Sequence, residues 1–193
     1  MVDESGSKSD SELVSDFRNG DMEALGALVK RHQASVFGYL LRLTGRREAA
    51  EDILQDVFLK FARGSGSYGE RDKFRAWLFT VARNAAMDHF RRERVRGSTP
   101  LEGEDGRPGV IDCVASPEPG PEAAAAGGEL GGRIAAALDR LSPEQRDVFY
   151  LRHYSGLSFR EVADMLGVPI GTALARMSRA AACLRKDLSG DKQ

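Results

Sequence analysis

Residues 158–185 read Ser-Phe-Arg-Glu-Val-Ala-Asp-Met-Leu-Gly-Val-Pro-Ile-Gly-Thr-Ala-Leu-Ala-Arg-Met-Ser-Arg-Ala-Ala-Ala-Cys-Leu-Arg, an order that predicts two helices joined by a tight turn. Ser158 and Glu161 form a capping-box pattern that starts the first helix. Gly167 supplies the turn, since glycine takes a positive φ without strain, and Pro169 stops the first helix from continuing. The stretch therefore predicts a helix-turn-helix, which places its second helix in the DNA major groove.

The second helix of this motif has one apolar side and one more polar side. The apolar stripe recurs at helical spacing and consists of Ala173, Met177, Ala180, Ala181 and Leu184. On or beside the other side lie Thr172, Ala175, Arg176 and Arg179. An ordinary helical hairpin with a solvated arginine face is the alternative. We favour DNA binding because the Ser158 cap, the small residue Ala163, Gly167 and Pro169 all fall at the positions that a helix-turn-helix requires.

Length and composition bound the class of protein. The chain has 193 residues, enough for one large domain or two small ones. It has no apolar run that could span a bilayer and no signal peptide, so we expect a cytoplasmic protein. Cys113 and Cys183 are isolated, and their spacing indicates no metal site. We expect no metal and no cofactor, and no enzymatic activity because His32, His89 and His153 have no nearby nucleophile or ligand partners in the sequence.

The net charge of −1 conceals a strong segregation of charge along the chain. Residues 74–96 contain six arginines and two acidic residues, and residues 160–186 contain five basic and two acidic residues. Between these two basic blocks, residues 97–130 contain seven acidic residues and one arginine. The near-zero total therefore does not exclude nucleic acid as a partner.

Helical periodicity without strand alternation predicts an all-α protein with two small helical domains. Asp21 is expected to cap a helix at its N-terminus, and Gly45 to end the helical stretch that follows. Further helices are expected from about Glu48 and from Phe74. These elements make a helical domain over 20–96, preceded by residues 1–19 as an N-terminal tail and first helix turn.

Residues 97–132 change character and are expected to form a flexible acidic linker. Five of the seven prolines and nine of the 21 glycines lie there, a composition too polar and too broken to bury a core. Helices resume in a second domain over 133–187, where Ser142-Pro143-Glu144-Gln145 is a strong helix start. Residues 188–193 are expected to be a C-terminal tail.

Three ordered blocks resemble a known family. Residues 50–60 (AEDILQDVFLK) look like sigma region 2.2, and residues 74–84 (FRAWLFTVARN), with Asp88, Arg91 and Arg92, look like regions 2.3 and 2.4. Residues 141–146 (LSPEQR) and the helix-turn-helix look like region 4. In this order and spacing the chain resembles the ECF (extracytoplasmic function) group of the bacterial sigma-70 family.

The resemblance implies a function in transcription initiation. Such proteins bind core RNA polymerase, recognise and melt the −10 element with region 2, and read the −35 element with region 4. An anti-sigma factor is a further expected partner. Two alternatives remain: a helix-turn-helix transcription regulator, and a sigma-like protein that binds polymerase or an anti-sigma factor without initiating.

One helix face is expected to bind core polymerase, as the resemblance implies. Asp52, Gln55, Asp56 and Leu59 are spaced i, i+3, i+4 and i+7, so they share a face. A mixed acidic and apolar face suits a basic helical partner, although the residues alone equally allow a solvated face. Metal binding is discounted because no histidine or further carboxylate converges in register.

The family places contacts to the −10 element at Tyr68, Asn84, Asp88, Arg91 and Arg92. Asparagine can read a base edge through two hydrogen bonds, and arginines hold phosphates. Asp88 either restrains an arginine or accepts from a base. Tyr68 lies in the loop that captures a flipped-out base in this family, and the alternative for that loop is a simple connection.

The family places contacts to the −35 element on the helix-turn-helix, here Ser158, Arg160, Thr172, Arg176 and Arg179. The chain departs from the family at Leu174, where a basic residue is usual. A lost phosphate contact lowers both the affinity and its dependence on salt, so we expect weak −35 binding by the isolated C-terminal domain. Alternatively, Leu174 contacts a partner protein such as an anti-sigma factor.

Overall fold

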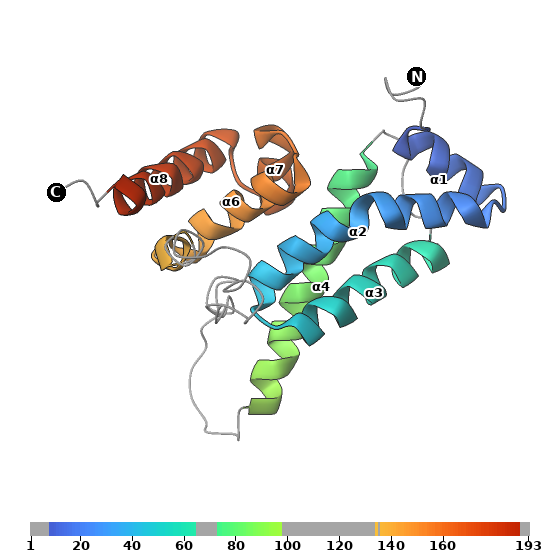
Figure 1. The fold of residues 1–193 in the computed structure, drawn as a ribbon, viewed down its shortest axis with the longest axis horizontal. Helices are drawn as coiled ribbons and strands as arrows, with labels where there is room; N and C mark the ends of the chain where they lie inside the picture. The colour runs from blue at the N-terminus through green and yellow to red at the C-terminus, as the bar shows by residue number, and fades with distance from the viewer. Residues whose placement is uncertain (1–7, 65–72, 98–133, 135, 190–193) are drawn as a thin grey trace.

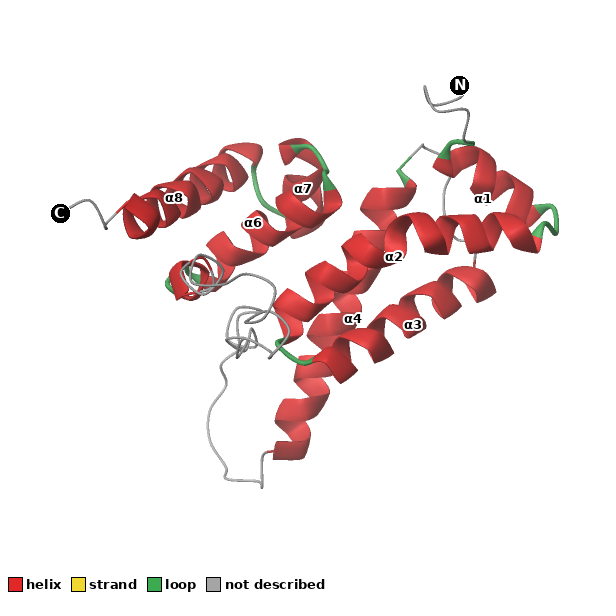
Figure 2. Cartoon of the chain, viewed as in Figure 1, coloured by secondary structure: helices red, strands yellow, loops and turns green. Residues whose placement is uncertain are grey.

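The computed structural model describes residues 8–64, 73–97, 134 and 136–189, and within those residues every regular element is a helix (Figure 2). The all-α prediction is confirmed. The elements run in the order α1 (Asp10–Arg18), α2 (Met22–Thr44), α3 (Arg47–Gly64), α4 (Phe74–Gly97), α6 (Pro143–Ser155), α7 (Phe159–Leu166) and α8 (Ile170–Ser189). Residues 136–139 are also helical.

The N-terminal domain is built around α2, which packs against α1, α3 and α4 (Figure 1). Asp21 caps α2 as predicted, because its carboxylate accepts from the backbone N–H of Glu23 at 2.9 Å. Gly45 ends α2 with a φ of 68°, the left-handed conformation that glycine adopts without strain. The core between these helices includes the fully buried Phe61 and Phe74, whose ring centroids lie 5.0 Å apart.

The N-terminal segment differs from the expected tail and first helix turn. Residues 10–18 form helix α1, with a complete capping box between Ser9 and Glu12. Its docking on α2 is ionic as well as apolar, because the Asp10 carboxylate receives Nη1 of Arg31 at 2.6 Å and Nε2 of His32 at 2.8 Å. Leu13 supplies part of the buried apolar contact. The sequence signal was weak because the helix is only nine residues long and depends on this packing.

The C-terminal domain consists of α6, α7 and α8. Ser142 and Ser158 each form the capping box predicted for them, at the starts of α6 and α7. Gly167 makes the turn between α7 and α8 with a φ of 65°. Ala173 and Ala180 of the predicted apolar stripe are fully buried, so this side of α8 faces α6 and α7. The helix-turn-helix prediction therefore agrees with the structure.

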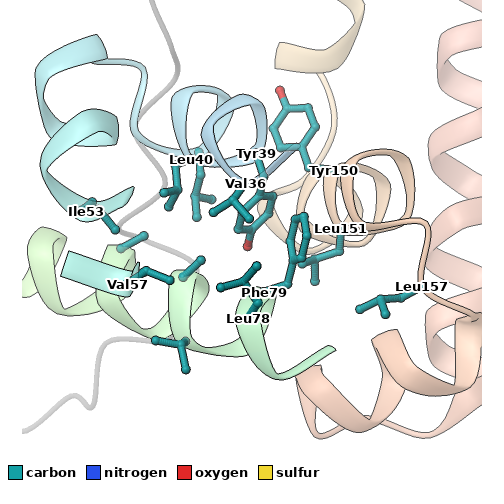
Figure 3. Packing of buried hydrophobic residues seen from close by; sticks show 14 of the residues in the cluster. Val36, Tyr39, Leu40, Ile53, Val57, Leu78, Phe79, Tyr150, Leu151 and Leu157 are labelled. Atoms are coloured by element: carbon teal, nitrogen blue, oxygen red, sulfur yellow. The ribbon is translucent and has the colours of Figure 1, made fainter. Parts of the chain in front are cut away.

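The two domains pack against each other through α2, α4 and α6. Figure 3 shows Tyr150 and Leu151 of α6 in the same hydrophobic cluster as Tyr39 of α2 and Phe79 of α4. Tyr154 of α6 lies directly over Gly38 in the middle of α2. Figure 1 shows α8 on the outer side of this arrangement, beyond α6 as seen from α2.

A buried polar cluster lies inside this interdomain contact. Asp147 of α6 accepts from Nε of Arg83 at 2.9 Å and from the hydroxyl of Tyr39 at 3.3 Å. Burial raises the pKa of Tyr39 well above its usual value, and the negative charge of Asp147 adds to the effect. The cluster therefore ties α2 and α4 of one domain to α6 of the other.

Candidate nucleic-acid interface

Helix α4 presents one buried side and one exposed side. Phe74, Leu78, Ala82 and Ala86 face the core and are almost completely buried. The exposed side carries the candidate −10 contacts Asn84, Asp88, Arg91 and Arg92. These residues follow one another along a single helix face.

Asp88 is tied to the arginines that follow it on α4. Arg91 donates from Nη1 to Oδ1 of Asp88 at 2.9 Å, and Arg92 donates from Nε to the backbone carbonyl of Asp88 at 3.2 Å. Of the two roles that the sequence left open, the structure thus shows Asp88 restraining an arginine. The Asp88–Arg91 ion pair is largely exposed and contributes little to stability, so phosphate can replace the carboxylate at low cost. Tyr68 lies outside the described residues.

The candidate −35 contacts on the helix-turn-helix differ in how far their side chains are exposed to solvent. Arg160 on α7 and Arg179 on α8 are exposed, whereas Thr172 and Arg176 are half-buried. The Ser158 hydroxyl donates to Oε2 of Glu161 at 2.7 Å as part of the helix cap.

Arg176 leans toward α6. Hydrogen bonding from Ser142 is the main cause that lowers the pKa of Glu144, and the nearby guanidinium of Arg176 lowers it further. Arg160 and Arg179 are therefore the freely presented cations of the predicted set.

The α3 face also has the predicted arrangement. Asp52, Gln55, Asp56 and Leu59 are all exposed, and the opposite side of α3 is buried against α2 and α4. An exposed fraction of 40% for Leu59 leaves an apolar contact between acidic side chains. The four side chains lie on an exposed surface of α3, and the binding of core polymerase by that surface stays a prediction.

Sequence reasoning missed two features. The first is the cluster of Tyr39, Arg83 and Asp147. In it Asp147 contacts Tyr39 across 108 positions of the sequence and Arg83 across 64 positions. The second is the exposure of Ile170 beside Leu174 on α8. The signal for the second was weak, because Ile170 lies three residues before Ala173 and seven before Met177 and so shares the spacing of the apolar stripe.

Two further properties concern metal and membrane. In the described ranges, no group of three or more histidine, cysteine, aspartate or glutamate side chains is placed to hold a metal ion. Among the same residues, none of the helices combines the length and the hydropathy that crossing a bilayer requires.

Comparison with known proteins follows the same division into two domains. The family model Sigma-70 region 2 matches residues 28–96, and Sigma-70, region 4 matches residues 131–184. The ECF RNA polymerase sigma factor SigM of Mycobacterium tuberculosis (strain H37Rv) is 36% identical over 93% of this chain and 84% of its own length. The chain belongs to the ECF group of sigma-70 factors. It is an alternative sigma factor that directs promoter recognition and transcription initiation.

Two further comparisons cover most of the chain. The sigma factor CarQ of Myxococcus xanthus is 32% identical over 88% of this sigma factor and 92% of its own length. The fold is similar to that of RpoE from Bartonella quintana, solved with the anti-sigma factor NepR, at a TM-score of 0.59 and 24% identity. That match covers 86% of this chain and 98% of RpoE. Sigma factors bind core RNA polymerase and promoter DNA and are not enzymes in the usual sense.

Proposed function

We propose that three exposed helix faces of this sigma factor divide the work of initiation. The α3 face binds core polymerase, the α4 face contacts the −10 element, and α8 enters the major groove of the −35 element. The observation that carries this proposal is the exposed row of Asn84, Asp88, Arg91 and Arg92 on a helix whose other side is buried. The Asn84 amide carries a donor and an acceptor and so suits a base edge, and the Arg91 and Arg92 cations that follow it suit phosphates.

Simultaneous reading of both elements requires the two domains to separate. Positions −10 and −35 lie about 85 Å apart on B-form DNA, at about 3.4 Å per base pair. In the structure α4 contacts α6 and α7, which in turn contact α8. Two such helix packings separate the helix axes by only about 20 Å, and α4 and α8 are themselves only about 36 Å and 30 Å long. The packed arrangement is therefore a form of the free protein that opens when both promoter elements are bound.

Transcription reconstituted with core polymerase tests the α3 assignment. Asp56→Arg reverses a charge in the middle of the exposed face and should weaken core binding and transcription together. Glu51→Arg is the matched control, since it makes the same charge change on the same helix about 140° around the axis from Asp56. The control disturbs only an exposed Arg47–Glu51 ion pair, which contributes little to stability. Equal core affinity for both variants would contradict the assignment.

The α4 assignment is tested on the same promoter after the holoenzyme has formed. Asn84→Ala should leave core affinity unchanged and reduce open-complex formation, because it removes a group that contacts only DNA. Permanganate reactivity of unpaired thymines measures melting directly. Normal melting by this variant would mean that the −10 element is read elsewhere.

An anti-sigma factor is a further proposed partner. RpoE of Bartonella quintana, whose fold this chain shares, was solved bound to one. The α3 face supports the proposal, because a protein that covers Asp52, Asp56 and Leu59 would block polymerase. Co-purification of the tagged full chain from its own cells, with Asp56→Arg as the comparison, tests whether the two partners compete for that face.

A further inference from the structure

Two exposed apolar side chains stand at the start of α8. Ile170 and Leu174 are each 45% exposed, and four residues of separation places them side by side over the first turns of the helix. Elsewhere on α8 the apolar residues at positions 173 and 180 are completely buried. The helix therefore buries its apolar stripe at positions 173 and 180, while its first turns extend the apolar surface into solvent at Ile170 and Leu174.

The surroundings of this apolar pair indicate what it fits. Gly171, Ala175 and Ser178 lie on the same exposed face, and their small side chains leave Leu174 as its most prominent group. Arg179 is exposed about 140° further around α8, and Arg160 is exposed on α7. An apolar side chain on a helix that also carries an exposed cation is complementary to a duplex groove, where phosphates flank the base edges.

The major groove offers one apolar group at the base edges, the C5-methyl of thymine. Residues near the N-terminus of a recognition helix are those that contact base edges, and Leu174 is in this position on α8. Leucine forms no side-chain hydrogen bond, so it cannot select guanine as an arginine or lysine does. The small neighbours of Leu174 allow the helix backbone to approach the bases closely.

We propose that Leu174, with Ile170 beside it, selects thymine in the −35 element by apolar contact with its C5-methyl group. The inference rests on the proposed function, in which α8 reads the −35 element. It changes the meaning of the departure from the family at Leu174. Leu174 lacks the contact that a basic residue would make with a polar base edge or a phosphate. It provides instead a preference for one base that needs no charge.

The two kinds of contact respond differently to salt. Contacts from Arg160 and Arg179 to phosphate release counterions, so total affinity falls as salt rises. A methyl contact releases no counterion, and the ratio of affinities for DNA with and without the methyl group stays constant. A thymine preference that survives high salt is the expected signature.

The test uses the full-length chain assembled with core polymerase. A duplex pool with a randomised −35 region first yields the bound sequence, and each selected thymine is then replaced in turn by deoxyuridine, which lacks only the methyl group. Wild-type holoenzyme should lose about fourfold in affinity for each methyl that Leu174 or Ile170 covers. Leu174→Ala should abolish that loss at one position, and Leu174→Arg should select guanine there.

Arg179→Ala is the matched control at another exposed position of the same helix. It should weaken binding to all duplexes alike while keeping the difference between thymine and deoxyuridine. Leu174 is half-exposed, so its replacement should leave the melting temperature almost unchanged, and this is checked in parallel.

Several results would overturn the inference. Equal affinity for thymine and deoxyuridine at every −35 position would refute it while leaving −35 binding by α8 intact. The same holds if Leu174→Ala keeps full sensitivity to the methyl group. Unchanged DNA binding by Leu174→Ala, with loss of a co-purifying anti-sigma factor, would assign the apolar pair to a protein partner. Holoenzyme that selects no −35 sequence at all would overturn both the inference and the proposed role of α8.

Discussion

The contact between Asp147, Arg83 and Tyr39 should hold the two domains together, and Asp147→Ala tests this directly. The Asp147 and Arg83 side chains are only 11% and 17% exposed, and the carboxylate accepts from Nε and Nη2 of Arg83, each at 2.9 Å. Truncation leaves a nearly buried guanidinium without its counter-charge. It also removes the acceptor of the Tyr39 hydroxyl.

The size of the effect follows from this burial. Removing one partner of a fully buried ion pair costs about 3–5 kcal/mol. The residual solvent contact of Arg83 reduces this to about 2–3 kcal/mol, a discount that follows from screening by water. Separation of the domains returns Arg83 to water and relieves the penalty. The ratio of packed to separated molecules should therefore fall about 30- to 150-fold, at 1.4 kcal/mol for each factor of ten.

Single-molecule energy transfer between dyes on α3 and α8 measures the separation. Urea is raised until the domains part, and the midpoint is compared between variants. Asp147→Ala should lower the midpoint, whereas Asp164→Ala, which removes an exposed carboxylate of the same domain, should not. The double variant Arg83→Met with Asp147→Leu should recover much of the packing, because apolar replacement of a buried ion pair is often neutral.

Two results would refute this reasoning. The first is a midpoint for Asp147→Ala equal to that of wild type and Asp164→Ala. The second is additivity of the Arg83 and Asp147 substitutions, since residues that interact give non-additive changes in free energy. A normal circular dichroism spectrum for each variant excludes general unfolding as the cause.

Three further outcomes are expected. Gly38→Ala should lower the urea midpoint for domain separation, because the new Cβ would lie 2.6 Å from Cε1 of Tyr154. Gly26→Ala is the control, because a Cβ there meets no atom within 4 Å and should only add about 1 kcal/mol of helix stability. Equal midpoints for the two variants would contradict the packing. Burial alone would raise the pKa of Asp10, but hydrogen bonds from the α2 side chains outweigh burial and hold that pKa below its usual value of 3.8. The stability that the Asp10 carboxylate contributes is present above the unfolded pKa and is lost as pH falls through the lower folded pKa. The amides of α1 should therefore exchange faster below about pH 4 in wild type, and Asp10→Asn should lack this acid step. Ser158→Ala should cost about 1 kcal/mol of C-terminal-domain stability by calorimetry, whereas Ser158→Asp should keep most of it; equal melting temperatures for the two would contradict a capping role.

Local signals in the sequence predicted the helices and their ends well. Asp21, Ser142 and Ser158 were each expected to cap a helix, and each does so. Gly45 and Gly167 end helices in the left-handed conformation, as expected. These features depend on residues within a few positions of one another, so the chain needs no tertiary contact to specify them.

Helix α1 shows where this local reasoning stops. Its capping box was present in the sequence at Ser9 and Glu12, yet nine residues are too few for a helix that is stable alone in water. Asp10 finds its partners Arg31 and His32 more than twenty positions away. The helix exists because α2 supplies the apolar and ionic contacts that stabilise it.

The sequence by itself determined the helix-turn-helix, the order of the family blocks and the exposed row on α4, because each is written in spacing along one helix or one turn. Only the tertiary structure decided that Asp147 would contact Arg83 and Tyr39. These partners lie 64 and 108 positions before it in the sequence, and no local periodicity links residues so far apart. Only the packing of α8 against α6 and α7 showed that Leu174 faces solvent. Burial is a property of the whole molecule: it encloses Leu151 of α6 in the core and leaves Leu174 of α8 exposed to solvent.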